Sequence, residues 1–171
     1  MLLSDVDIRQ LLSVGIIKVE PLQDNQITQA GIDLTLSDEF WKFTEKAKRS
    51  VQDLSVVGAD HVTEKIVAPF VDLRPGELIL GKTVEKITLP PNIMGRLEGR
   101  SRYARMGLAV HSTSAIVQPG SSNRQVLEIM NLGPLTLRLR AGLRISQIVF
   151  EELKSGTSKP YAKFGEVARR Q

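Results

Sequence analysis

The chain has no cysteine, and its 171 residues include only two histidines, His61 and His111. Without thiol groups it cannot form a disulfide-stabilised scaffold, use a thiolate nucleophile or bind zinc through thiolate ligands. The two histidines lie far apart in the sequence, which gives little support to a histidine-based metal site or catalytic triad. The lack of cysteine is compatible with a reducing compartment, and we expect a cytoplasmic location.

Aromatic residues and long apolar runs are also scarce. Aromatic side chains make up 5% of the chain, and Tyr103 is the only one within residues 87–149. One aromatic side chain is poor provision for stacking the bases of a nucleic acid. No apolar run approaches membrane-spanning length, and the N-terminus lacks the basic and then apolar layout of a signal peptide. We therefore expect a soluble protein with neither a nucleic-acid nor a membrane partner.

The overall composition is that of an ordinary globular domain, with 42% hydrophobic and 25% charged residues. The length suffices for one sizeable core and is too short for two ordinary ones. We interpret residues 1–171 as a single domain. Residues 154–171 are polar and basic and contain glycine, which is typical of a mobile C-terminal segment.

The net charge of +4 is unevenly distributed along the chain. Residues 1–86 carry ten basic and fourteen acidic side chains, whereas residues 87–150 carry eight basic and two acidic ones. All eight bases in the second segment are arginine, whose planar guanidinium suits bidentate contacts to phosphate and carboxylate. Two interpretations stay open: a basic sheet face that is solvated or paired with the acidic half, and a site for a polyphosphate or nucleic acid.

The hydropathy pattern predicts one N-terminal helix followed by many short strands. Ser4 is a plausible N-cap for a helix over residues 4–13, and Gly15 ends it. A second, short helical stretch is expected at residues 101–106, closed by Gly107. Turns about every ten residues favour an all-β sandwich, jelly roll or barrel. Strands are expected at residues 16–20, 32–36, 78–80, 84–89, 108–114, 135–140 and 145–150.

The densest group of candidate binding residues is the segment Gly99-Arg100-Ser101-Arg102-Tyr103-Ala104-Arg105. A turn that leads into a helical turn presents backbone N–H groups, a hydroxyl and guanidinium groups together. This combination is suited to holding phosphates. The alternative is a basic helix cap with no ligand.

Glu128 interrupts an apolar strand, Val126-Leu127-Glu128-Ile129-Met130. A positioned carboxylate near a cation can act as a general base. The alternative is a glutamate at a strand edge that pairs with Arg124, and strand patterning alone favours this alternative.

Four collinear segments resemble the dCTP deaminase/dUTPase superfamily. Residues 99–131 (GRSRYARMGLAVHSTSAIVQPGSSNRQVLEIMN) resemble the central motif of dCTP deaminases, whose usual form is GRSSLAR, a strand with HxT, a turn with PG or AG, and xLE. The other three matches are residues 30–34 (AGIDL), 73–91 (LRPGELILGKTVEKITLPP) and 142–150 (GLRISQIVF).

The resemblance implies an all-β, jelly-roll-like distorted β-barrel with a short N-terminal helix and small helical turns. It also implies a homotrimer with active sites at the subunit interfaces. The substrate class would be a deoxyribonucleoside triphosphate that carries Mg²⁺ on its phosphates. No metal ligated directly by the protein and no catalytic zinc would take part in deamination, in contrast to the zinc-dependent deaminases.

The resemblance also assigns catalytic roles to four residues. Glu128 would be the general base that takes a proton from the water attacking C4 of cytosine. Ser101 and Arg105 would hold the water and the developing charge. The backbone of Ser114 would contribute to the same water site.

Further residues would bind the substrate by the same resemblance. Arg100 and Gln147 match phosphate-binding residues, and Asp33 would support the Mg²⁺–triphosphate region as a possible second-shell group. Tyr161 and Lys163 fall in the tail, residues 154–171, that closes over the nucleotide as a lid.

Two positions depart from the family pattern. Arg102 stands where a second serine is usual and could still hold phosphate by its charge. Gln118 stands where an aspartate contacts the sugar 3′-hydroxyl, and an amide can hydrogen-bond a hydroxyl but cannot act as a base.

The expected activity is hydrolysis of the cytosine C–N bond, dCTP + H₂O to dUTP + NH₃, which supplies dUTP for dTTP synthesis. The alternatives are a bifunctional dCTP deaminase/dUTP diphosphatase, or a dUTPase that releases dUMP and pyrophosphate. A non-catalytic nucleotide-binding or nucleic-acid-binding β domain is a further alternative from another functional class.

Overall fold

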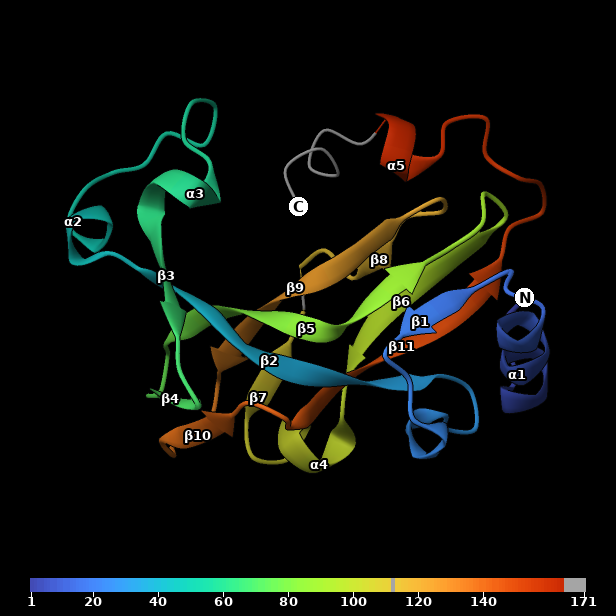
Figure 1. Ribbon diagram of the computed structural model, residues 1–171. Helices are drawn as coiled ribbons and strands as arrows, with labels where there is room; N and C mark the ends of the chain where they lie inside the picture. The colour runs from blue at the N-terminus through green and yellow to red at the C-terminus, as the bar shows by residue number, and fades with distance from the viewer. Residues whose placement is uncertain (112, 165–171) are drawn as a thin grey trace.

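The computed structural model describes residues 1–111 and 113–164, and most of them lie in or between antiparallel β-strands (Figure 1). The strands are β1 (Lys18–Glu20), β2 (Ile32–Phe43), β3 (Thr63–Val67), β4 (Phe70–Leu73), β5 (Leu78–Thr88), β6 (Ile93–Gly99), β7 (Leu108–Val110), β8 (Ile116–Val117), β9 (Ser122–Asn131), β10 (Leu137–Arg140) and β11 (Arg144–Glu152). The helical elements are α1 (Asp5–Ser13), η1 (Asp24–Gln26), α2 (Glu45–Lys48), α3 (Ala59–Val62), α4 (Ser101–Ala104) and α5 (Tyr161–Phe164).

Helix α1 begins and ends as the sequence predicts. The Ser4 hydroxyl accepts a hydrogen bond from the Asp7 backbone N–H, and the Asp7 carboxylate accepts one from the Ser4 backbone N–H at 2.9 Å. This reciprocal capping box satisfies two backbone donors that a helix leaves unpaired. Gly15 follows with φ +70°, a conformation that glycine adopts without a steric penalty.

The main sheet has nine strands, and its central path runs β7-β9-β5-β2-β11-β6-β8, with β1 paired to β5 and β3 to β2. The first and last members of this path, β7 and β8, are the two halves of one segment, residues 108–117. Val110 pairs with Ile129 of β9, while Ile116 pairs with Arg96 of β6. The sheet therefore curls until its two edges approach each other along this segment. A separate two-stranded sheet joins β10 and β4.

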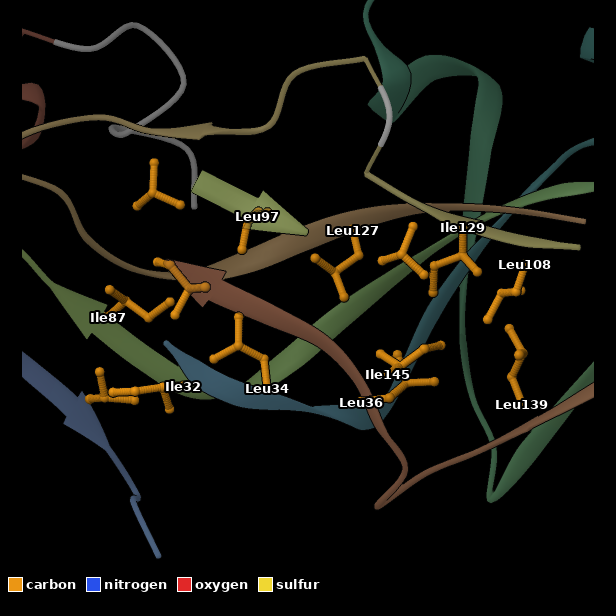
Figure 2. Packing of buried hydrophobic residues seen from close by; sticks show 14 of the residues in the cluster. Ile32, Leu34, Leu36, Ile87, Leu97, Leu108, Leu127, Ile129, Leu139 and Ile145 are labelled. Carbon is orange, nitrogen blue, oxygen red and sulfur yellow. The ribbon is translucent and has the colours of Figure 1, made fainter. Parts of the chain in front are cut away.

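The core fills the inside of this curled sheet (Figure 2). On β2, Ile32, Leu34 and Leu36 are completely buried, and Phe40 and Phe150 are the largest fully buried side chains. Alternating strands such as β10 bury their leucines and expose their arginines. Such two-sided strands are the pattern of a sheet with one face on the core.

The strand predictions hold in part. The expected strands at residues 78–80 and 84–89 are one strand, β5, with an irregularity of register between Lys82 and Lys86 opposite β9. Strands β3, β4, β6 and β8 were not predicted, and the strand expected at residues 108–114 ends at Val110 as β7. β6 contains two glycines and an arginine, which obscure its alternation in the sequence. Among the described residues, no helix is long and apolar enough to cross a membrane.

Candidate active site

Glu128 lies in β9 between two completely buried residues, Leu127 and Ile129, so its side chain points to the outer face of the sheet. The side chain is 30% exposed. The hydroxyl of Thr113 donates a hydrogen bond of 2.7 Å to Glu128 Oε2. Arg124, the partner expected for a purely structural glutamate, instead donates from Nε to the carbonyl of Val84 at 3.1 Å, so the expected pairing of Glu128 with Arg124 is wrong.

His111 bonds to the backbone of Glu128 and to the backbone of the loop that follows β7. Its backbone N–H donates to the Glu128 carbonyl at 2.8 Å and so extends the β7–β9 ladder by one residue. Its Nε2 lies 2.7 Å from the Ser114 carbonyl, and its Nδ1 lies 3.4 Å from the Glu128 backbone N. A carbonyl only accepts, so Nε2 carries the proton and Nδ1 accepts from the Glu128 N–H. The ring thus fixes both Glu128 and the loop that carries Ser114.

The backbone of this loop is unusual at His111. Its φ is +58°, and it is the one non-glycine residue with positive φ in the described part of the chain. Non-glycine residues in this region mark strain that the surroundings must over-determine, and they cluster at functional sites. From the sequence, His111 was assigned no site role and Thr113 was not singled out. The HxT spacing within the resemblance was the signal that could have identified both.

Beyond Glu128, one edge of β9 is open. β7 pairs with β9 only at residues 129–131, and β8 pairs with β6 instead, so residues 124–127 have no paired residue in β7 or β8 among the described residues. Since the Glu128 carbonyl accepts from His111 on this side, strand alternation aims the Val126 N–H and C=O to the same side. The open edge runs from Glu128 toward the turn at Gln118. Both residues are predicted to contact the same bound nucleotide.

A second group of predicted residues, the Arg100 cluster, is Asp33 on β2, Gln147 on β11 and Arg100 at the start of α4. Asp33 is paired with Gln147 in the β2–β11 register. Arg100 Nη2 lies 3.0 Å from Asp33 Oδ2, and Gln147 Nε2 donates to the Gly99 carbonyl at 3.4 Å. Burial raises the pKa of the Asp33 carboxyl above its ordinary value, and the positive charges of Arg100 and then Arg144 oppose this rise.

The next residues of the central motif lie in α4, a single helical turn, which is close to the predicted stretch of residues 101–106. Ser101, Arg102 and Arg105 are all exposed. The Arg102 guanidinium lies 5.2 Å from the centroid of the Tyr103 ring. Gly107, with φ +89°, ends this turn as expected. These side chains are therefore presented to whatever approaches α4.

The third group joins the turn at Gln118 to the C-terminal tail. The Pro119 and Gly120 carbonyls accept hydrogen bonds from the backbone N–H groups of Tyr161 and Ala162, at 3.0 and 3.1 Å. Gln118 and Tyr161 share a shallow hollow of about 190 Å³. Lys163 lies in α5. The predicted mobility of the tail stays a prediction, and its residues 165–171 lie outside the described residues.

The second and third groups lie apart within one chain. In Figure 1, α4 lies at the bottom of the sheet and α5 at the top, so these two elements are far apart. A hollow of about 950 Å³ elsewhere on the chain is lined by residues of β3, β4 and the turn before β5 and contains none of the predicted site residues. Among the described residues, no group of three or more His, Asp or Glu side chains is arranged to hold a metal ion.

Comparison with known proteins gives a consistent result. Residues 2–153 match a family model described as dCTP deaminase-like. A dCTP deaminase of Rhodospirillum rubrum is 42% identical over 173 residues, covering 95% of this chain and 88% of the relative. One of Halorubrum lacusprofundi is 38% identical, covering 94% and 82%. A protein of Parafrankia sp. named dCTP deaminase, dUMP-forming, is 36% identical, covering 94% and 81%.

Solved structures agree on the fold. The 2′-deoxycytidine 5′-triphosphate deaminase of Agrobacterium tumefaciens superposes with a TM-score of 0.68 at 20% identity over 88% of this chain. The match covers 47% of that protein, so this chain spans about half its length. A Staphylococcus bacteriophage 80alpha dUTPase gives a TM-score of 0.52 at 17% identity, covering 90% of this chain and 92% of the dUTPase. The predicted fold class is confirmed.

Proposed function

The chain belongs to the dCTP deaminase family, and we propose that it hydrolyses dCTP to dUTP and ammonia with Glu128 as the general base. The observation that carries the proposal is the Glu128 carboxylate itself. It is half-buried, held at one oxygen by Thr113, and placed where the open edge of β9 begins. A carboxylate fixed at one oxygen can use the other to orient and deprotonate a water molecule.

The proposed reaction proceeds through addition and elimination at C4 of cytosine. Glu128 accepts a proton from water as the oxygen bonds to C4, and the C4–N3 double bond becomes single. The proton passes from Glu128 to N3. The second water proton, delivered through Glu128, reaches the exocyclic amino group, the C4–N bond breaks, and ammonia leaves as the C4 carbonyl forms. Ser101 and Arg105 hold the attacking water and the charge that develops on oxygen.

A site assembled from two copies of the chain fits the separation of the second and third groups. Helix α4, which follows Arg100, and helix α5, whose first residues bond to the turn after Gln118, lie at opposite ends of the sheet (Figure 1). A nucleotide with its phosphates near α4 and its sugar near that turn would therefore need two copies of the chain. The α4 turn of a neighbouring copy would bring Ser101 and Arg105 to Glu128. We propose the homotrimer expected for this family as that assembly, with the tail residues Tyr161 and Lys163 closing over the nucleotide.

Positive charge at α4 suits the triphosphate. Arg100 and Arg102 supply guanidinium groups, and Gln147 supplies an amide beside them. Such charge-assisted contacts are the strong ones for phosphate. We propose that Mg²⁺ reaches the site on the triphosphate of the substrate, where it would neutralise phosphate charge.

The product of the reaction is either dUTP or dUMP. Relatives of similar identity carry both names, dCTP deaminase and dCTP deaminase, dUMP-forming. Gln118 favours dUTP as the product, since a neutral amide cannot activate water for cleavage of the diphosphate. Incubation with dCTP, followed by separation of dUTP, dUMP and pyrophosphate, tests this. Release of dUMP with pyrophosphate in step with ammonia would overturn the dUTP product and leave the deamination intact.

Substitution of Glu128 tests the deamination directly. Glu128→Gln keeps the shape and removes the base, and ammonia release from dCTP should fall by about 10²- to 10⁴-fold. Glu45→Gln, which alters an exposed carboxylate of α2 paired with Lys48, is the matched control and should leave the rate unchanged. Undiminished ammonia release by Glu128→Gln contradicts the proposed mechanism.

A further inference from the structure

Asp33 is an ionisable residue inside an apolar strand. Its neighbours Ile32 and Leu34 are completely buried, and the Asp33 side chain itself is only 6% exposed. A carboxylate at such a position is costly unless it is paired with a cation or hydrogen-bonded. Its presence between two buried residues at the start of β2 therefore points to a task that an apolar residue could not perform.

The cationic partner of Asp33 is Arg100, and Arg100 is held at two points. Its Nη2 lies 3.0 Å from Asp33 Oδ2, and its Nη1 donates to the Arg144 carbonyl at 3.0 Å. A guanidinium has five N–H donors in a rigid, planar arrangement. The two contacts engage one N–H on each terminal nitrogen, so the orientation of the plane is set while each of these nitrogens keeps a second N–H.

Arg144 completes the support. Its side chain donates from Nη1 to the Asn25 carbonyl at 2.8 Å and from Nη2 to Gln23 Oε1 at 3.1 Å. The carbonyl that Arg100 contacts therefore belongs to a residue that is itself fixed, at both backbone and side chain, between β11 and η1. Arg100 follows β6 in the sequence, but its side chain bonds to residues of β2 and β11.

The register of the sheet places a second phosphate-binding candidate at the same point. Gln147 of β11 pairs with Asp33 on one side and with Glu98 of β6 on the other. Its amide reaches the Gly99 carbonyl, next to Arg100. Asp33 is thus ion-paired with Arg100 and strand-paired with Gln147, the two residues to which the proposed function assigns the phosphates.

We propose that Asp33 is a positioning residue for the triphosphate: it does not touch the nucleotide, but orients the Arg100 guanidinium so that its remaining N–H groups face the phosphates. This inference rests on the proposed function of the same site. It predicts a specific kinetic signature, because Arg100 would contact the phosphates equally in the bound substrate and in the transition state. Loss of such a contact raises KM and leaves kcat nearly unchanged.

The first experiment compares Asp33→Asn, Arg100→Ala and the double variant in dCTP turnover. Asp33→Asn should raise KM about tenfold, the size expected for a charge-assisted hydrogen bond, and should change kcat by less than about threefold. The double variant should be no worse than Arg100→Ala alone, because Asp33 acts only through Arg100. Additive effects on KM would overturn the proposal, as would a loss in kcat with KM unchanged.

The second experiment does not depend on turnover. Binding of inorganic tripolyphosphate, measured by calorimetry, should weaken about tenfold in Asp33→Asn and in Arg100→Lys, which keeps the charge but loses the planar fork. Asp72→Asn, which alters an exposed carboxylate paired with Arg138, is the matched control and should bind tripolyphosphate as the wild type does.

The outcomes separate the two proposals. If wild-type protein binds tripolyphosphate in an Asp33-dependent manner but releases no ammonia from dCTP, the proposed function fails and the positioning role stands. If Asp33→Asn folds, as judged by its thermal unfolding, and binds tripolyphosphate with wild-type affinity, the positioning role fails. Should Asp33→Asn not fold, Arg100→Lys decides, and unchanged tripolyphosphate affinity in that variant overturns the proposal.

Discussion

The Thr113 hydroxyl donates a hydrogen bond of 2.7 Å to Oε2 of Glu128, across the junction between the loop after β7 and strand β9. The same loop is held by His111, whose ring bonds the Ser114 carbonyl and the Glu128 backbone N–H. One carboxylate oxygen is thus fixed, and the other is left to act on a ligand. The orientation of the proposed general base therefore depends on a residue that does not itself transfer a proton.

Replacing Thr113 by valine should impair turnover without impairing substrate binding. Thr113→Val keeps the shape of the side chain and removes the donor, so Glu128 loses its orientation and kcat should fall by about tenfold or more. Thr113→Ser retains the hydroxyl and should keep most of the rate. Steady-state ammonia release from dCTP measures both. A valine variant with wild-type kcat would show that this hydrogen bond does not position Glu128.

Gly120→Ala should release the C-terminal tail from its docking site. Gly120 has φ +79°, and an added Cβ would lie 2.6 Å from Pro160 Cβ and 2.9 Å from Pro160 Cα. The clash would break the backbone hydrogen bonds from Tyr161 and Ala162 to this turn. We expect faster tryptic cleavage at Lys163, which lies in α5, and a higher KM for dCTP.

Gly142→Ala is the matched control for that experiment. Gly142 has φ +86°, but a Cβ there would meet no atom within 4 Å. Both variants carry similar backbone strain, and only Gly120→Ala disturbs the tail. Equal tryptic cleavage of the two variants at Lys163 would contradict the predicted docking.

The buried side chain of Gln26 should make a measurable contribution to stability. Its Nε2 donates to Glu85 Oε1 at 2.7 Å and to the Asp33 carbonyl at 2.8 Å, and Glu85 is 1% exposed. Gln26→Ala leaves these buried acceptors without their donor and should lower the free energy of unfolding by about 1–3 kcal/mol. Urea unfolding measures this, with the exposed Gln10→Ala as control. Equal stability of the two variants would contradict the expectation.

The pair of Asp72 on β4 and Arg138 on β10 should give a pH-dependent contribution to stability. The hydrogen bonds from the Arg138 side chain hold the pKa of the Asp72 carboxyl below its usual range. A depressed folded-state pKa stabilises the folded protein at neutral pH, and this stabilisation is lost as the pH falls below the ordinary carboxyl pKa.

Arg138→Gln should therefore lower the thermal unfolding midpoint at pH about 7, and the difference from wild type should narrow as the pH approaches about 3. Because the pair is exposed, high salt should also reduce the difference. A difference in midpoint that stays constant across this pH range would assign the effect to the stacking of Arg138 on Phe70, at 4.1 Å, rather than to the ion pair.

Local signals predicted local structure well. Ser4 and Asp7 form the cap of α1 because both partners lie within one helical turn, and the alternating Leu and Arg residues of β10 follow from the two-residue period of a strand. Strand β6 was missed because its glycines and charges hide that period. Gly95 in β6 is glycine for a long-range reason: a Cβ there would lie 2.5 Å from Ile148 Cδ1 of the neighbouring strand.

For the functional residues, the sequence identified the candidates but not their contact partners. Glu128, Ser101, Arg105 and the other candidates were identified from their types, their order and their resemblance to a family, all of which are properties of the sequence alone. Their partners were not identifiable from the sequence. The contacts between Thr113 and Glu128 and between Asp33 and Arg100 join different elements, and the register between strands decides them.

The sequence by itself therefore determined the composition, the local caps and turns, the alternating strands and the family. Only the tertiary structure decided which of the candidate residues meet. The curl of the sheet brings Asp33, Arg100 and Gln147 together, and it places α4 and α5 at opposite ends (Figure 1). The physical reason is that contacts between distant strands depend on the packing of the whole core, which no short stretch of sequence encodes.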